Sequence, residues 1–285
     1  MLYVPISQTS DVETHVTATT NETATFGISV TAGGTANTKN STYTTLIATT
    51  SYEAFGIMVT LMGLQTTATT NQRCLVDIAI GAASSEQVII PNLTCGNVSD
   101  YAAASSLGAS YVFPIKIASG VRISATAQAS TASDIVNVAV RLFRHPFGVN
   151  GWYGSRVTAY GADTTNSRGT SHTPSQNSYA TATQLTASTT NPIHYMQLGF
   201  DLLSDTTASN ARYLARIGYG ATPTYLASEL MLKESTTIEA VTFTDANMQL
   251  SQMHFNIPSA QSLHISAMRD AATPEARGFI VYGVD

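Results

Sequence analysis

The chain has 285 residues, of which 44% are hydrophobic and only 11% are charged, and its formal net charge is −5 at pH 7. Soluble domains carry roughly 25% charged residues, and the thirteen Lys and Arg of this chain are scattered, so the composition excludes the basic footprint of a nucleic-acid-binding protein. No stretch is apolar enough over a sufficient length to span a bilayer. The first residues lack the charged-then-apolar layout of a signal peptide, so we expect a protein made and used without conventional secretion, with neither nucleic acid nor a membrane as partner.

The first half of the sequence predicts a series of short strands. About one residue in seven is threonine, whose branched Cβ favours strands and whose hydroxyl keeps a strand surface wet without charge. Residues 1–7 either add a strand to a sheet, dock on a neighbouring subunit or form a frayed start. A helix is predicted at 99–107. The apolar patterns indicate strands at 24–30, 54–63, 73–80, 87–91, 111–117, 121–127 and 136–142.

A turn-rich connector is expected over residues 145–154, where Gly, Pro and Asn gather. It holds the only tryptophan of the chain, Trp152. We expect this side chain to pack between the two halves and to fix their angle, with a contact to another subunit or to a ligand as the alternative.

The second half repeats the first. The pattern R-x-L-x-x-I-x-x-G-A occurs at Arg73–Ala82 and again at Arg212–Ala221, an offset of about 140 residues. A short helix is predicted at 245–250, and strands are expected at 195–202, 213–219, 226–232, 255–257, 262–267 and 278–282. The repeat predicts an all-β protein built as two tandem, jelly-roll-like β-sandwiches related by internal duplication. The first, with its N-terminal arm, spans 1–147, and the connector and second sandwich span 148–285.

No catalytic, cofactor or metal site is predicted. The sequence contains no nucleophile elbow, P-loop, dinucleotide fingerprint or zincin motif. His254 and His264 sit on adjacent predicted strands but have no carboxylate or cysteine nearby, which disfavours a metal site. The carboxylates flanking the repeated Gly-Ala turns, at Asp77, Glu86 and Glu229, are interpreted as turn and strand-end solvation. We therefore expect a protein that is not an enzyme.

Two further features concern single side chains. Cys74 is expected to be a small buried thiol, and a bridge to Cys95 is the less favoured alternative. Asp77 aligns with Arg216 in the repeat. A charge reversal at equivalent positions indicates a salt bridge between the units or between subunits.

Part of the first unit resembles a known class of protein. The runs Val76–Ala82, Glu86–Leu93, Phe113–Ile115 and Gly120–Ile123 are similar to β-sandwich virion proteins of tailed bacteriophages. The second unit keeps only Ile217, Gly220-Ala221, Glu229 and Ile257-Pro258 of this pattern. The resemblance implies a multi-copy structural role on a particle assembled in the host cytoplasm, no cofactor, and cyclic homo-oligomers, trimers above all.

Two functions follow as hypotheses from this resemblance. The first is a virion component that decorates or cements the capsid or builds a head spike, held by the major capsid protein or by tail proteins. The second is a tail-fibre or baseplate protein that binds host surface polysaccharide through the loop aromatic residues Trp152, Tyr153 and Tyr160 and through loop Asn and Asp residues, since an aromatic face stacks on a sugar ring. A carbohydrate-active enzyme is disfavoured, because no paired acids are recognisable.

Overall fold

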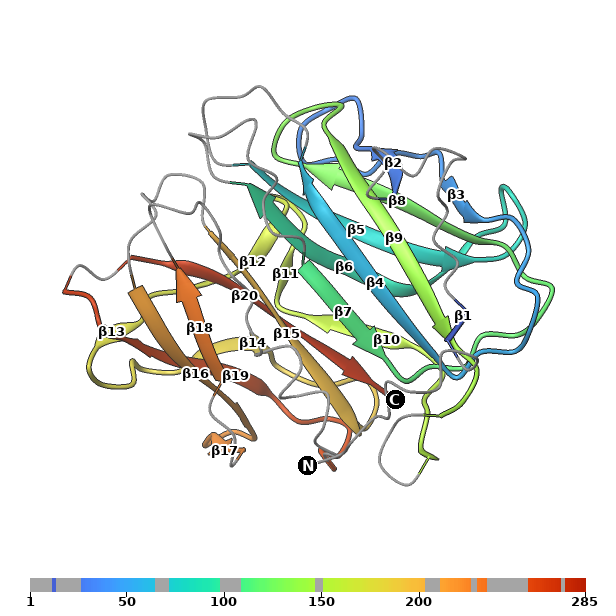
Figure 1. The fold of residues 1–285 in the computed structure, drawn as a ribbon. Helices are drawn as coiled ribbons and strands as arrows, with labels where there is room; N and C mark the ends of the chain where they lie inside the picture. The colour runs from blue at the N-terminus through green and yellow to red at the C-terminus, as the bar shows by residue number, and fades with distance from the viewer. Residues whose placement is uncertain are drawn as a thin grey trace.

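The computed structural model of the protein describes residues 12–13, 27–64, 72–97, 109–146, 151–202, 211–226, 230–234, 256–272 and 275–285. Its regular elements, β1 to β20, are all strands (Figure 1). The all-β prediction is confirmed. The helices predicted at 99–107 and 245–250, and the N-terminal segment 1–7, lie outside the described residues.

The strands of the first half form two antiparallel sheets. Sheet A has the order β1-β9-β4-β7, with β2 also paired to β9, and sheet B has the order β3-β8-β5-β6. The strands are β1 (Val12–Glu13), β2 (Ile28–Thr31), β3 (Thr44–Ile47), β4 (Gly56–Leu64), β5 (Gln72–Ile80), β6 (Gln87–Asn97), β7 (Ala109–Phe113), β8 (Ile123–Ala129) and β9 (Ile135–Phe143). The predicted strands of this half are present, with ends that shift by a few residues.

The strands of the second half form two more sheets. Sheet C has the order β10-β20-β12-β11, with β15 also paired to β20, and sheet D has the order β13-β19-β16-β17, with β14 and β18 as further partners of β19 and β16. The strands are β10 (Val157–Tyr160), β11 (Ala162–Asp163), β12 (Arg168–His172), β13 (Ser175–Gln176), β14 (Thr183–Thr186), β15 (Tyr195–Leu202), β16 (Ala211–Tyr219), β17 (Thr224–Tyr225), β18 (Leu230–Glu234), β19 (Leu263–Arg269) and β20 (Arg277–Val284).

Both halves have the strand order of a jelly roll. In the first, β2-β9-β4-β7 faces β3-β8-β5-β6, the pairing expected for eight strands wound as two Greek keys. In the second, β12-β20-β15 and β14-β19-β16-β18 repeat that order. The stretch where a counterpart of β7 is expected lies outside the described residues. This shared order is what a duplication would produce, and the duplication itself stays a prediction.

Three parts of the second half differ from the expected pattern. The strands β10 to β14 occupy a stretch for which the sequence predicts no strand. The strand predicted at 226–232 overlaps β18, which pairs with β16, and a short strand β17 precedes it. Of the strand predicted at 255–257, the described residues form only an isolated bridge between Ile257 and Ile193. The expected boundary between residues 147 and 148 falls between β9 and β10.

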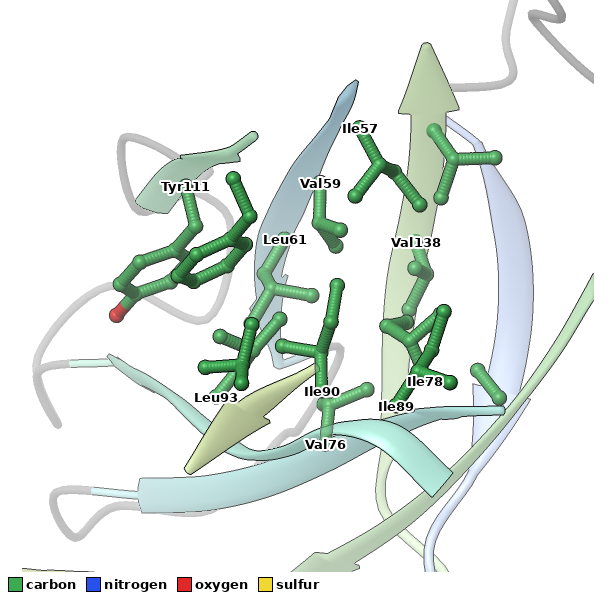
Figure 2. Close-up of a cluster of buried hydrophobic side chains, with 14 of the residues drawn as sticks. Ile57, Val59, Leu61, Val76, Ile78, Ile89, Ile90, Leu93, Tyr111 and Val138 are labelled. Atoms are coloured by element: carbon green, nitrogen blue, oxygen red, sulfur yellow. The ribbon is translucent and has the colours of Figure 1, made fainter. Parts of the chain in front are cut away.

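The core of the first sandwich lies between sheets A and B. Ile57, Val59 and Leu61 of β4 point toward Val76 and Ile78 of β5 (Figure 2). Strand β9 alternates between buried and less buried positions, as a strand with one covered face should. By contrast, β8 and β20 are buried at every position. Strands β8 and β20 therefore have both faces covered, and the cover on their second faces includes the neighbouring sandwich.

Candidate functional site at the junction of the two sandwiches

The two sandwiches share one apolar core at their junction. Five residues of the second half belong to the core cluster of the first: Val157, Tyr195, Ile280, Tyr282 and Val284. Trp152 packs against the same cluster and meets the ring of His194 edge-on, with centroids 5.5 Å apart. Its half-buried side chain lies at the junction, and its role in fixing the angle between the halves stays a prediction.

Gln197 of β15 closes the free edge of sheet A. Its Oε1 accepts a hydrogen bond from the backbone N–H of Val112 at 3.0 Å, and its Nε2 donates to the Val112 carbonyl at 2.7 Å. The Tyr195 hydroxyl donates to the same carbonyl at 2.8 Å. An edge strand exposes unpaired backbone groups, so the Gln197 amide acts as a one-residue extension of the sheet.

Tyr282 of β20 binds the backbone of β6. Its hydroxyl accepts from the N–H of Thr94 and donates to the carbonyl of Asn92, each at 2.8 Å. The Tyr111 hydroxyl donates to the Thr94 carbonyl at 2.7 Å, and the two tyrosine rings meet edge-on at 5.2 Å. One tyrosine from each sandwich thus holds the same strand.

A buried carboxylate completes the junction. Asp201 of β15 is 2% exposed, and its Oδ2 accepts from the N–H of Gly169 at 2.7 Å and from the hydroxyl of Thr94 at 3.0 Å. Burial raises the pKa of Asp201 to about 6, while these hydrogen bonds and the charges of Arg73 and Arg168 act in the opposite direction. Its Oδ1 is buried without a hydrogen-bond partner. The site therefore favours a neutral acid.

The turn before β12 covers a corner of sheet B. The Nε2 of Gln128, in β8, donates to the Thr164 carbonyl at 2.6 Å and to the Ser167 hydroxyl at 3.0 Å. Gln128 is 2% exposed and Ser167 is fully buried. The second sandwich consequently hides part of the outer face of sheet B.

Asp77 and Arg216 occupy equivalent positions but do not meet. Asp77 lies opposite Thr126 on β8, and Arg216 lies opposite Ser266 on β19. Asp77 forms its ion pair with Lys39 inside the first sandwich. The guanidinium of Arg216 lies between two tyrosine rings, Tyr179 and Tyr225, with its carbon 3.8 and 3.7 Å from the ring centroids. The predicted salt bridge between the units is therefore not formed within the chain, and a bridge between subunits stays a prediction.

The two tyrosines predicted as ligand contacts differ in exposure. Tyr153 is 39% exposed and meets Phe55 edge-on at 4.9 Å. Tyr160 is not a loop residue: it lies in β10, is 5% exposed and packs into the core of the second sandwich. Its ring has no free face for a sugar, which corrects the expectation for this residue.

The side chains weighed for metal binding and catalysis have structural partners. Within the described ranges, no three His, Cys, Asp or Glu residues gather as metal ligands. Glu86 pairs with Arg122 at 2.8 Å, and His254 and Glu229 lie outside those ranges. Cys74 and Cys95 are cross-strand neighbours on β5 and β6, and both remain buried thiols.

His172 is a further histidine with a structural role. Its Nδ1 lies 2.8 Å from the Thr183 hydroxyl, and its Nε2 accepts from the N–H of Ala267 at 3.0 Å. Burial lowers its pKa, so the neutral ring serves as a link between β12 and β19.

The part of the chain that the structure describes contains no helix of the length and apolar character needed to cross a membrane.

Sequence reasoning missed the polar residues that hold the junction. Gln197 and Asp201 alternate with apolar residues along β15, a pattern that normally marks a solvent-facing side. Gln128 lies in a strand of small and polar residues. Nothing in these patterns distinguishes a side covered by water from one covered by a second sandwich.

Comparisons with known proteins give distant structural likenesses only. No family model matches the sequence, and no curated protein matches it. The chain is similar to the structure of PNGF-II in C2 space group, with a TM-score of 0.38 and 10% identity over 97% of this chain and 66% of that one.

Two further likenesses come from virus structures. One is described as the triple jelly roll fold and turret assembly in an archaeal virus, with a TM-score of 0.23 and 11% identity over 91% of this chain and 58% of that one. The other is the atomic structure of Sulfolobus Turreted Icosahedral Virus, with a TM-score of 0.24 and 10% identity over 91% of this chain and 59% of that one.

The chain thus spans 58 to 66% of the length of these three structures. Because every TM-score lies below 0.5, the likenesses carry no inference about function, and the fold assignment depends on the strand order. None of the three descriptions names a tailed bacteriophage, so that part of the sequence resemblance stays a prediction.

Proposed function

We propose that the protein is a structural component of a virus particle, acting as a capsid decoration or cement protein or as a head spike, without enzymatic activity. The observation that carries the proposal is the junction. Strands β8 and β20 are buried at every position, and Gln197, Tyr282 and Asp201 bind the backbone or side chains of the first sandwich. A double sandwich joined by buried hydrogen bonds and a shared apolar core suits a structural part of a particle.

The chemistry of the chain supports the same role. Only 11% of its residues are charged. When a strand face packs against a neighbour, few charged groups therefore lose their hydration, and the hydroxyls need only a hydrogen-bond partner. Many weak contacts of this kind, repeated over a particle, add up through avidity. The partners would be a major capsid or tail protein and further copies of the chain.

The test is to locate the protein on particles. Purified particles should contain it in many copies, and particles from a deletion strain should rebind the purified protein in a co-sedimentation assay. Extra density in a particle image, present only after rebinding, would give its position. Absence from particles, or turnover of a polysaccharide by the purified protein, would refute the proposal.

A tail-fibre or baseplate protein that binds host polysaccharide is the second candidate. It is favoured by Tyr153, whose ring is 39% exposed next to Phe55 and offers a stacking surface for a sugar. Binding on a glycan array that is lost in Tyr153→Ala and kept in Val88→Ala, a change at another exposed apolar residue, would favour this function over the first.

A further inference from the structure

The outer face of sheet D carries an open apolar cavity. Its volume is about 350 Å³, and Asn177, Leu214, Met268 and the ion pair of Arg212 with Asp270 are among the residues that line it. Leu214 and Met268 lie opposite each other on β16 and β19 and are half-buried. An apolar centre with a charged rim is the composition of a protein–protein contact.

The equivalent place on the first sandwich is already occupied. There Leu75 lies opposite Gln128 on β5 and β8, as Leu214 lies opposite Met268. Leu75 is fully buried and Gln128 is 2% exposed. Gln128 donates to the turn at 164–167 of the second sandwich and to the Asn37 carbonyl of the first. The chain therefore contains one example of a segment that covers this corner of a sandwich.

We propose that the cavity on sheet D is the docking site for a second copy of this chain. The inference rests on the proposed building role and names the surface through which copies join. Within one chain, sheet C lies against β6 of sheet B and β7 of sheet A, and the turn at 164–167 covers a corner of sheet B. The matching step between chains places sheet A of the second copy against sheet D of the first, so that the junction inside the chain is continued between chains.

The outer face of sheet A would dock on the second copy. It is the counterpart of the outer face of sheet C, which packs against the first sandwich within the chain. Met58 lies opposite Arg141 on β4 and β9, and Gln197 lies opposite Tyr282 on β15 and β20. Gln197 and Tyr282 are buried in the junction. Met58 is half-buried and Arg141 is exposed, so among the described residues the same positions on sheet A are open to a contact.

The contact is heterologous, because it joins two different surfaces. The socket is the surface around Leu214 on sheet D, and the plug is the surface around Met58 on sheet A. Such contacts join copies head to tail into a ring or a filament. Socket and plug lie on different sheets, so each can be altered alone. Leu214→Glu alters the socket and Met58→Glu alters the plug. Val88→Glu, at an exposed apolar residue of β6, is the matched control.

The experiment measures the mass of the full chain over a concentration series by analytical ultracentrifugation. Wild type and Val88→Glu should self-associate. Each of the other two variants should weaken association by about 100-fold or more, because an unpaired carboxylate resists burial. An equimolar mixture of Leu214→Glu and Met58→Glu should form a one-to-one dimer, since each variant supplies the half that the other lacks.

The mixture also shows that the two variants are folded. A monomeric wild type at every soluble concentration, association that survives both changes, or a mixture that stays monomeric would overturn the proposal. Absence of the protein from virus particles would refute the proposed function instead, and would leave the association measured in solution unchanged.

Discussion

Replacing Asp201 with asparagine tests whether the carboxylate in the junction opposes folding near neutral pH. Burial raises the pKa of Asp201 from 3.8 to about 6, against the lowering effect of hydrogen bonds from Gly169 and Thr94. One pKa unit corresponds to about 1.4 kcal/mol, so ionising the buried acid costs the fold about 3 kcal/mol. Asparagine offers an oxygen to both donors without the charge, so Asp201→Asn should be more stable than wild type by up to about 3 kcal/mol at neutral pH.

The pH dependence of this gain has a definite sign. Because the folded-state pKa of Asp201 is raised, the folded protein binds the proton more tightly than the unfolded chain does. The stability contributed by the neutral acid is complete below the unfolded pKa of 3.8 and is lost as pH rises through about 6. The advantage of Asp201→Asn should therefore be small below about pH 4 and reach its full value near pH 7.

Urea unfolding at a series of pH values, followed by the fluorescence of Trp152 at the junction, measures the difference. Asp163→Asn is the control. Burial raises the pKa of Asp163, but hydrogen bonds from Asn166 and Arg168 lower it by more, so the net shift is downward. That carboxylate contributes stability above its unfolded pKa, and its loss should destabilise the protein at neutral pH. A difference between wild type and Asp201→Asn that does not change with pH would refute the reasoning.

Three other substitutions probe the junction by the same unfolding assay. Gln197→Ala should cost about 2 to 4 kcal/mol, because it leaves the N–H of Val112 without its partner; a loss below about 0.5 kcal/mol would contradict this. Tyr282→Phe removes the hydroxyl that both accepts from and donates to the backbone of β6 and should cost about 1 to 3 kcal/mol, and an unchanged midpoint would count against it. Gly278→Ala should destabilise the protein, since its Cβ would lie 1.8 Å from the Asp201 Oδ1 and displace this buried side chain; a wild-type midpoint would show that the Asp201 carboxyl moves aside without cost.

Strand periodicity was enough to predict the class of fold and most of its strands. Val136, Val138, Val140 and Leu142 share one face of β9 and are all buried, as their spacing indicates. Long alternating or apolar runs bounded by Gly and Pro are the strongest signal that a single sequence offers. Such runs survive in both halves, which is why the same strand order is recognisable in each.

The sequence predicts no strand at β3 or at β10 to β14, because these short strands are stabilised by pairing rather than by a pattern of their own. Strand β12 reads RGTSH and β13 reads SQ, and neither carries an apolar face. They form strands because their backbone groups pair with β20 and β19. The sequence predicts a loop at Tyr160 for the same reason, since the register that buries this residue comes from pairing with Val281.

The junction could have been located by comparing equivalent strands instead of reading each alone. Strand β9 reads IVNVAVRLF and alternates, whereas its counterpart β20 reads RGFIVYGV with no polar residue after the first. A continuous apolar run indicates a strand covered on both faces, so the contrast identifies sheet C, and not sheet A, as the sheet buried inside the chain. On sheet D, β16 keeps an alternating burial pattern, and Met268 of β19 stands where the first sandwich has Gln128. Among the described residues, Leu214 and Met268 are half-buried apolar side chains on the outer face of this sheet. An exposed apolar patch is a common feature of interaction surfaces, and this difference between the two halves is the basis of the proposed docking site.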